Sequence, residues 1–405
     1  MAGFWQSLLN QAGGGGIVGQ IISFVFLMIF ITFYSRIAVQ QIMFKLEKSA
    51  LMLEDMSNKA EKIVVRRINK KPDKKIQQKI RSFLEFFAIP PVDTDPYGVM
   101  KKLEHIVNQE KYRFKYFVGQ VAPKSGQEEQ ANIMMGLSGA MNLYQIKKIV
   151  RHFVELIKET KSINLAFLIQ MQLPFIEKLA GALLRGTEAL TYGWPIGDSV
   201  GPYVATSLMD DKAKEIDGET VVSRRKMKNR DVIIVKAKGP GGRTGNPGKV
   251  IEKIAKKERI AKIITIDAAA KLEGEKTGTI AEGVGIAMGG VGVERYQLEE
   301  VSTRLQVPMD SVIIKMSSEE AIMPMKEPIW KAVPNATKTV EELVQTTRGK
   351  GAVVIIGVGN TCGVGNDRKS LENADQIIKT NIRKTKLIEE QKKKKFRLKF
   401  PSFGF

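Results

Sequence analysis

The chain has 405 residues, with 64 Lys and Arg against 43 Asp and Glu and a formal net charge of +21. This length predicts two or three modules rather than one core, and 43% hydrophobic residues exclude a wholly disordered chain. One cysteine and two histidines exclude an intrachain disulfide framework and a multi-cysteine zinc site, and they disfavour a His-rich metal site.

The excess positive charge lies mainly in two segments. Residues 45–82 carry twelve basic and five acidic residues, and residues 371–405 carry ten basic and four acidic ones. The first segment follows an uncharged apolar run, and the second ends in lysines interleaved with phenylalanines. This placement predicts an anionic membrane surface as the partner and makes nucleic acid the least favoured one.

The first predicted element is a transmembrane helix at residues 17–36, after a short extracytoplasmic N-terminus at 1–16. Its run of about 20 residues, uncharged before Arg36, suffices to cross a hydrocarbon core. Arg36, Lys45 and Lys48 follow the run, so the positive-inside rule predicts a single-pass cell-membrane protein with its C-terminal bulk in the cytoplasm. A signal peptide is disfavoured because there is no positive n-region and no small-x-small cleavage pattern.

A helical stalk is predicted at residues 37–72. Apolar positions recur at heptad spacing, with one polar member and a basic end: Ile42, Leu46, Ser49, Leu53, Met56, Ala60, Ile63 and Arg67. Two interpretations are equally open. In the first, the seam pairs two chains in a parallel coiled coil, which would make the protein a homo-oligomer. In the second, the helix packs on its own domain.

The body is predicted to have two parts, a helical domain at 73–185 and an α/β domain at 186–370. In the helical part, closely spaced prolines predict an extended loop over 89–97. In the second part, short β-rich runs alternate with helical patterns. We therefore expect a three-layer α/β fold with a mostly parallel sheet, whose ligands would lie at the carboxyl ends of the strands.

Two glycine-rich loops are candidate ligand-binding sites, although neither is a complete nucleotide motif and no cofactor is specified. The loop at 239–249 lacks the glycine and the Ser or Thr of a P-loop. It would bind an anion at the following helix start, or it is a flexible turn. The candidate binding residues in the two loops are Gly241, Gly242, Arg243, Lys249, Gly357, Gly359 and Asn360.

Two further loops carry a resemblance. Residues 197–202 read GDSVGP, and Ile266-Asp267-Ala268 ends a predicted strand before a glycine-rich stretch. This order resembles hydrogenase maturation peptidases and the spore germination protease. The resemblance covers roughly residues 186–370. It implies a phosphorylase/hydrolase-like α/β fold, and it implies that Asp198 and Asp267 face one cleft as catalytic acids. The layout as a whole also resembles an archaeal family of uncharacterised function, which implies no reaction.

Residues 371–405 form a basic tail, for which a lipid-bound segment, a nucleic-acid arm and a solvated tail are all compatible with the composition. The leading functional hypothesis is a membrane-anchored cytoplasmic protein. Its α/β cleft binds an unidentified ligand or peptide, with peptidase- or hydrolase-like activity as the expected chemistry. The alternative is a non-enzymatic oligomeric membrane scaffold that recruits partner proteins or lipid.

Overall fold

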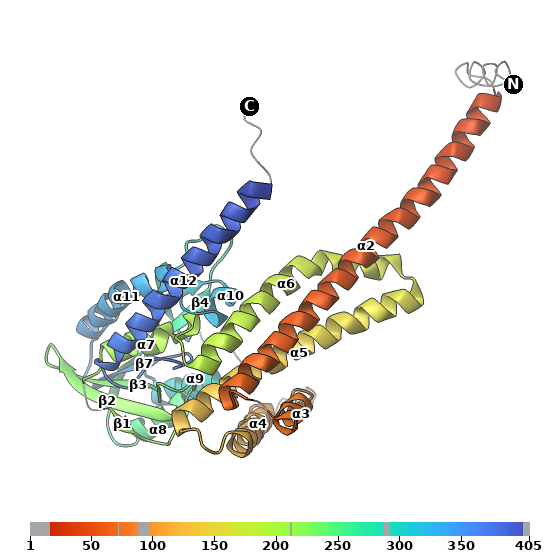
Figure 1. Cartoon of the computed structure of the whole chain (residues 1–405). Helices are drawn as coiled ribbons and strands as arrows, with labels where there is room; N and C mark the ends of the chain where they lie inside the picture. Colours follow the sequence, from red (N-terminus) through yellow and green to blue (C-terminus); the bar gives the residue numbers. More distant parts are fainter. Residues whose placement is uncertain (1–16, 72, 88–97, 211–212, 287–291, 400–405) are drawn as a thin grey trace. The chain divides into compact units, whose positions relative to one another are not determined.

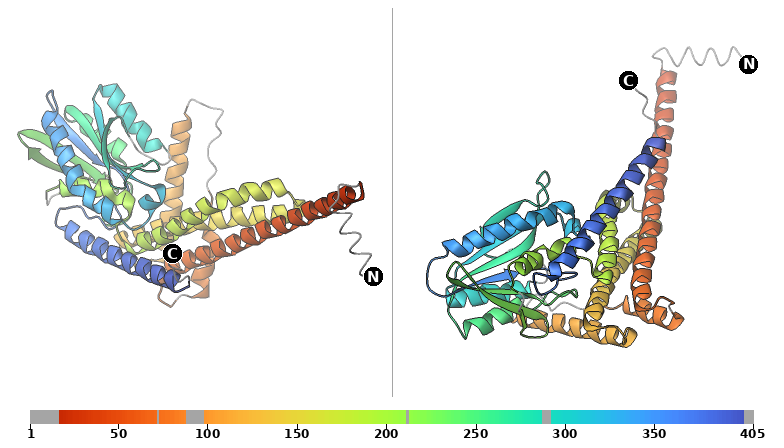
Figure 2. Two further views of the ribbon diagram at one scale, coloured as in Figure 1. Left: turned by 90° about the horizontal axis from the view of Figure 1, so that it is seen from above. Right: turned by 60° about the vertical axis from the view of Figure 1, so that its left-hand side comes forward.

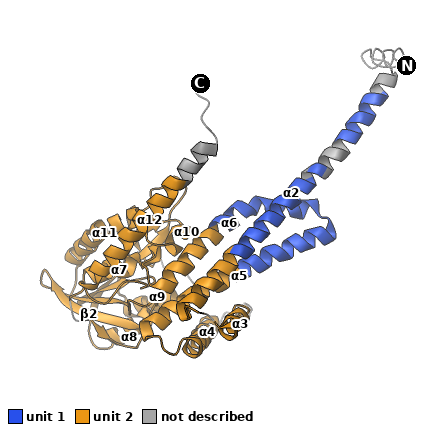
Figure 3. Ribbon diagram, viewed as in Figure 1, with its two compact units in different colours: residues 1–55, 145–178 blue, residues 56–144, 179–405 orange. Residues whose placement is uncertain are grey.

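The computed structural model describes residues 17–71, 73–87, 98–210, 213–286 and 292–399 (Figure 1). The chain divides into two compact units, coloured separately in Figure 3. Unit 1 comprises residues 1–55 and 145–178, and unit 2 comprises residues 56–144 and 179–405. The short N-terminus, the proline-rich loop and the Phe-rich chain end predicted from the sequence lie wholly or largely outside the described residues.

Unit 1 is built from parts of three long helices, α2 (Ile17–Ile68), α5 (Gln127–Thr160) and α6 (Ile163–Tyr192). Its buried apolar side chains come from all three: Ile42, Leu46, Leu53, Val150, Val154, Ile157, Ala166, Ile169 and Leu173. Arg151 of α5 ties the helices together with ion pairs to Glu47 at 2.6 Å and Glu54 at 2.9 Å. The hydrogen bond from Arg151 lowers the pKa of Glu47, which keeps the pair ionised.

The predicted membrane span and stalk form a single uninterrupted helix, α2. The heptad seam is largely buried within the chain: Leu46 and Leu53 are fully buried, and Ser49 donates a 2.5 Å hydrogen bond to Glu177. Of the two interpretations of the seam, the structure therefore favours packing on the chain's own helices, because the positions that would face a second chain are already covered.

One helix of the described residues, α6, is long and apolar enough to cross a membrane, and it lies in the middle of the chain. Only 22% of its most apolar window is buried. The expected N-terminal span is described in part, and Ile21–Phe30 forms a shorter apolar stretch of α2. The large apolar side chains of this stretch are all exposed by 41% or more. Within the described ranges, exposed apolar side chains therefore occur both on the start of α2 and on α6.

Unit 2 contains the helices α3 (Lys74–Phe83) and α4 (Val99–Val121). It also contains a seven-stranded sheet in the order β1-β2-β3-β7-β4-β6-β5. Asp73 caps α3 by accepting a hydrogen bond from the backbone N–H of Lys75. The strands are β1 (Lys214–Glu215), β2 (Thr220–Met227), β3 (Arg230–Ala237), β4 (Ile260–Ala270), β5 (Ile280–Val284), β6 (Met309–Met316) and β7 (Ala352–Gly357).

The sheet is mixed, which corrects the expectation of a mostly parallel one. The central strands β3, β7, β4 and β6 are parallel, whereas β1, β2 and β5 pair antiparallel at the two edges. At one edge, a short turn explains the antiparallel pairing. β2 and β3 are joined in a two-residue turn by Lys228 and Asn229, both with positive φ. Such a turn reverses the chain and leaves no length for a parallel crossover.

Helices cover both faces of this sheet, so the expected three layers are present (Figures 1 and 2). The two faces alternate along each central strand: Ile234 packs against one layer of helices and Ile233 against the other. The first layer comprises α7 (Val200–Ser207), α11 (Glu327–Thr346) and α12 (Ser370–Lys399), and the second comprises α8 (Pro247–Ala255) and α9 (Val293–Leu305). The predicted basic tail therefore begins as a packed helix, with Ala374 and Ile378 buried.

Gly201→Ala tests the close approach of α7 to the sheet. A Cβ on Gly201 would lie 2.1 Å from the carbonyl oxygen of Val358 and 2.4 Å from that of Ile266. We expect the substitution to lower the free energy of unfolding by about 1–3 kcal/mol through overpacking, measured as a lower thermal unfolding midpoint of the detergent-solubilised chain.

Gly181→Ala is the matched control, because a Cβ there meets nothing within 4 Å and the position lies inside α6. We expect it to raise the free energy of unfolding by about 0.5–1 kcal/mol through helix propensity. Equal midpoints for the two variants would contradict the close-packing account.

Candidate functional site

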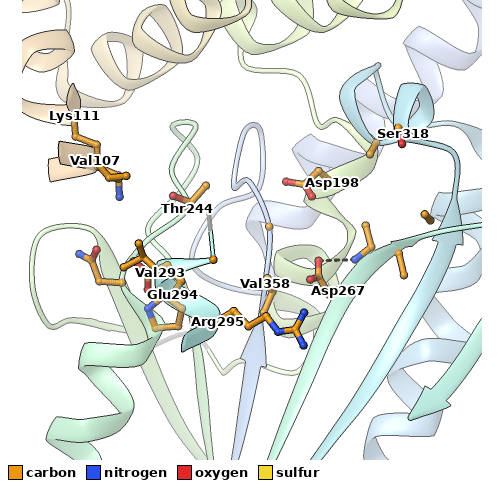
Figure 4. A pocket seen from close by; sticks show the side chains of 18 of the residues that line it. Val107, Lys111, Asp198, Thr244, Asp267, Val293, Glu294, Arg295, Ser318 and Val358 are labelled. Carbon is orange, nitrogen blue, oxygen red and sulfur yellow. Dashed lines mark hydrogen bonds between the residues drawn. The ribbon is translucent and has the colours of Figure 1, made fainter. Parts of the chain in front are cut away.

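A cavity of about 540 Å³ lies in unit 2 at the carboxyl ends of β4 and β7 (Figure 4). Its walls come from α4, the loop before α8, the end of β4, the start of α9, the start of α10 (Ser318–Ile322), the turn η1 (Gly197–Ser199) and the loop after β7. Sheets of this kind bind ligands at that edge. Four of the residues predicted from the sequence line it: Asp198, Asp267, Lys249 and Gly359.

Asp198 is held by close backbone contacts on both sides. A Cβ on the preceding Gly197 would lie 2.1 Å from the carbonyl oxygen of Glu320, and one on Gly359 would lie 2.1 Å from the carbonyl oxygen of Asp198 itself. Gly359 also has φ +122°, which side-chain-bearing residues rarely adopt. The backbone N–H of Asn360 donates a 2.8 Å hydrogen bond to Oδ2 of Asp198. The glycines therefore fix both the position and the orientation of this carboxyl group.

Asp267 occupies the end of β4 and is only 4% exposed. Its Oδ1 accepts a 2.7 Å hydrogen bond from the backbone N–H of Ala268. Burial, followed by the negative charge of Asp198, raises the pKa of Asp267 to about 8. Burial also raises the pKa of Asp198, against the opposing effect of the Asn360 N–H. Figure 4 shows the two carboxyl groups on the same side of the cavity.

The two carboxyl groups thus form a coupled acid pair. Because burial and the charge of Asp198 disfavour ionisation of Asp267, the pair retains a proton near neutral pH. A protonated carboxyl donates a hydrogen bond to a carbonyl oxygen or a leaving group, while an ionised one accepts a proton from water. Such a pair supplies acid and base within one cavity, as acid–base hydrolysis requires.

Several charged cavity residues were not predicted from the sequence. Lys111 and Glu104 come from α4, and Glu104 forms a 2.6 Å ion pair with Lys249 of α8. Glu294 lies in the first turn of α9, where burial raises its pKa. Arg295, beside it, pairs with Glu299 at 2.8 Å. No local motif distinguishes these residues, and α4 reaches the cavity only through the tertiary fold.

The loop at 239–249 uses most of its predicted binding groups within the protein. The backbone N–H of Gly241 donates to Glu128 Oε2 at 2.7 Å, and that of Gly242 donates to Asn132 Oδ1 at 2.8 Å. Arg243 is 7% exposed and pairs with the same Glu128 oxygen at 2.6 Å. These three groups therefore anchor the loop to α5 and lie outside the cavity lining, whereas Lys249 lines it.

The loop after β7 is likewise structural over much of its length. Gly357 lies against α7, where a Cβ would come within 2.5 Å of Ala205. The side-chain oxygen of Asn360 accepts a 2.9 Å hydrogen bond from the backbone N–H of Cys362. The Cys362 thiol is fully buried and its pKa is raised, which is inconsistent with a nucleophile. Of this loop, Gly359 is the predicted residue that reaches the cavity.

Within the described ranges, no group of three or more His, Cys, Asp or Glu side chains is arranged to hold a metal ion. Both histidines are exposed on helices, and His105 lies 2.9 Å from the side chain of Gln109. The carboxyl pair therefore provides two oxygen-bearing side chains for a cation and no His or Cys ligand.

The fold and the cavity define a three-layer α/β protein with a carboxyl-lined cleft, preceded by a long-helix N-terminal part. Residues 196–365 match the family described as "Domain of unknown function (DUF1512) C-terminal". Residues 20–193 match the corresponding "Protein of unknown function (DUF1512) N-terminal domain". The chain belongs to the DUF1512 family. No curated protein and no solved structure matches it, so the resemblance to hydrogenase maturation peptidases gains no support from these comparisons.

Asp267→Asn tests the protonated carboxyl. Because the pKa of Asp267 is raised in the folded chain, the native state retains a proton that the unfolded chain releases above its ordinary pKa. The free energy of unfolding should fall as pH rises from about 4 to about 8, by about 1.4 kcal/mol per pH unit from this group. Asp267→Asn should lose this contribution, measured by denaturant unfolding across that range. Parallel pH curves for the two proteins would contradict the raised pKa.

Proposed function

We propose that this protein is a membrane-anchored hydrolase whose α/β cleft binds its substrate beside the Asp198–Asp267 pair. The observation that carries the proposal is the raised pKa of Asp267, next to a second carboxyl in a cavity large enough for a small organic or peptide ligand. The close backbone packing of Gly197 and Gly359 around Asp198 supports the same assignment, because it holds this carboxyl group at the cavity.

In this mechanism Asp267 acts first as the acid. Asp198 accepts a proton from the attacking water as the water oxygen bonds to the substrate carbonyl carbon, and Asp267 gives its proton to the leaving group as the scissile bond breaks. Passage of the proton from Asp198 to Asp267 then restores the pair. The backbone N–H of Asn360 orients Asp198 by holding Oδ2, which leaves Oδ1 for water. Lys111, Lys249 and Arg295 line the same cavity together with Glu104 and Glu294, and Glu104 pairs with Lys249, so the lining offers a substrate both signs of charge. The segments that resemble maturation and germination peptidases make peptide bonds the first substrate class to examine.

Membrane attachment is the second part of the proposal. Ile21–Phe30 is an exposed apolar stretch at the start of α2, and it lies within the charge-free run of the sequence. A helix continuing through this run would anchor the chain in the bilayer. The basic residues that follow it favour a cytoplasmic position for the catalytic unit and contact with anionic lipid.

The scaffold alternative loses its main support. It required the α2 seam to be available for a second chain, and Leu46 and Leu53 of that seam are fully buried within this one. A homo-oligomer formed through another surface remains compatible with the fold, but it needs no separate function. The hydrolase proposal is therefore the one we develop.

Hydrolysis should depend on both carboxyl groups. We expect the full chain in nanodiscs to cleave a mixture of fluorogenic peptides and aryl esters. Asp198→Asn and Asp267→Asn should each lower the rate by about 10²–10⁴-fold, the usual contribution of a general acid or base. Fluorescence release across pH 5–10 measures this, and the rate should fall above about pH 8 as Asp267 loses its proton.

Asp231→Asn serves as the control, because Asp231 is an exposed carboxylate at the start of β3 and does not line the cavity. It should leave the rate unchanged. Wild-type protein without activity on any probe, or Asp267→Asn with the wild-type rate, would count against the hydrolase proposal.

The anchor should fail when charge is placed in it. Phe26 and Ile29 are 70% and 57% exposed on α2. Replacing both by Lys costs about 2.5–3.5 kcal/mol each in a membrane span, so the chain should pass into the soluble fraction after an alkaline carbonate wash. Leu51→Lys on the same helix, outside the predicted span, is the control and should stay with the membranes. Retention of both variants would contradict anchoring by α2.

A further inference from the structure

Lys236 is a buried amine that the proposed reaction does not use. It lies near the end of β3, is 1% exposed and is absent from the described lining of the cavity. Burial lowers its pKa to about 7, against the opposite effect of the Glu128 and Asp367 carboxylates. Burying an amine costs more than burying an apolar side chain unless it is hydrogen-bonded. Its hydrogen bonds therefore indicate what it does.

Lys236 supports a link between two loops. Its Nζ donates to the carbonyl oxygen of Ala237 at 3.0 Å and to Oδ1 of Asn366 at 3.1 Å. The Asn366 amide binds Gly239 twice, because Oδ1 accepts from the Gly239 N–H at 2.8 Å and Nδ2 donates to the Gly239 carbonyl oxygen at 2.7 Å. Gly239 follows β3, whereas Asn366 follows β7. We refer to the Lys236–Asn366–Gly239 contacts as the loop clasp.

The same two loops also touch at other points. They leave the sheet side by side, since β3 and β7 are parallel neighbours. The backbone N–H of Gly363 donates to the carbonyl oxygen of Pro240 at 2.9 Å. The buried Thr361 hydroxyl donates to the carbonyl oxygen of Gly241 at 2.7 Å. Two glycine-rich segments that suggested ligand sites in the sequence thus bind one another over much of their length.

Each loop supplies part of the candidate site. Thr244 of the first loop and Gly359 of the second line the cavity. Asn360, the next residue of the second loop, holds Oδ2 of Asp198 through its backbone N–H at 2.8 Å. This N–H stabilises the ionised form of Asp198 and so opposes the rise in its pKa that burial causes. Whatever fixes the second loop therefore influences which carboxyl group of the pair ionises first.

We propose that Lys236 is a positioning residue for the Asp198–Asp267 pair, and that it acts through Asn366 and the loop after β7. The clasp keeps the Asn360 N–H on Asp198, so that Asp198 ionises before Asp267 and serves as the base. The inference rests on the proposed function for the roles of these two acids. Its test, however, needs no substrate.

Asn366→Ala breaks the clasp without removing a charge. Weaker contact between Asp198 and the Asn360 N–H makes the ionised form of Asp198 less stable. The lower of the pair's two ionisation steps should therefore move to higher pH by about one unit. Infrared difference spectra of the full chain in nanodiscs, from about pH 4 to about pH 9, measure this step. Asp198→Asn assigns the carboxyl band.

Lys236→Met keeps an unbranched side chain of similar length and should give the same shift. The double variant should shift no further than either single variant, because both changes break one connection. Lys262→Met is the matched control. Lys262 donates a 2.6 Å hydrogen bond to Asp310 near the starts of β4 and β6, away from the described cavity lining. This control should leave the titration unchanged.

A wild-type titration in Asn366→Ala would overturn the inference. A shift confined to Lys236→Met would also overturn it, because the charge of the lysine would then act without the clasp. An equal shift in Lys262→Met would assign the effect to general loosening of the sheet. Loss of folding in both clasp variants, with Lys262→Met folded, would leave Lys236 a role in stability alone and would overturn positioning. Absence of hydrolysis by the wild type would contradict the proposed function without changing these titrations.

Discussion

The functional site depends on one constraint, the direct contact of backbone with backbone where η1 and α7 meet the ends of β4 and β7. Gly197, Gly201 and Gly359 lie where a Cβ would approach a carbonyl oxygen to 2.1 Å. Only glycine permits this approach without displacing the neighbouring chain. The contact carries Asp198 to the edge of the sheet where β4 presents Asp267. Two elements almost 70 residues apart in sequence thus supply one pair of acids.

The surroundings of this pair determine its chemistry. Asp267 is almost fully buried, so its ionised form loses the solvation that it has in water. Among the described residues, no cationic side chain forms a hydrogen bond with it that would offset this loss. Asp198 adds a like charge, while the Asn360 N–H partly compensates Asp198. The charged side chains from α4, α8 and α9 also line the cavity and give it a mixed polarity. The helical N-terminal part and the α/β part are therefore both needed to build the cavity.

The sequence was informative where short-range patterns decide the structure. The resemblance carried by the GDSVGP and Ile266-Asp267-Ala268 segments implied that Asp198 and Asp267 face one cleft, and both residues line the cavity. The sequence was less informative where distant segments meet. The heptad spacing of α2 could not show which helices cover its seam, and no local signal placed Glu104 or Lys111 in the cavity. The glycines at 241 and 242 resembled an anion site, yet Glu128 and Asn132 from α5 occupy their N–H groups.

The central claim is that the pair holds a proton at neutral pH, and infrared difference spectroscopy of the full chain measures this without a substrate. The carbonyl stretch of a protonated carboxyl group should be present at pH 7, disappear as pH rises through about 8, and be missing from Asp267→Asn. An identical band in wild type and Asp267→Asn would assign the proton to another buried carboxyl. That result, or no such band at pH 7, would contradict the account.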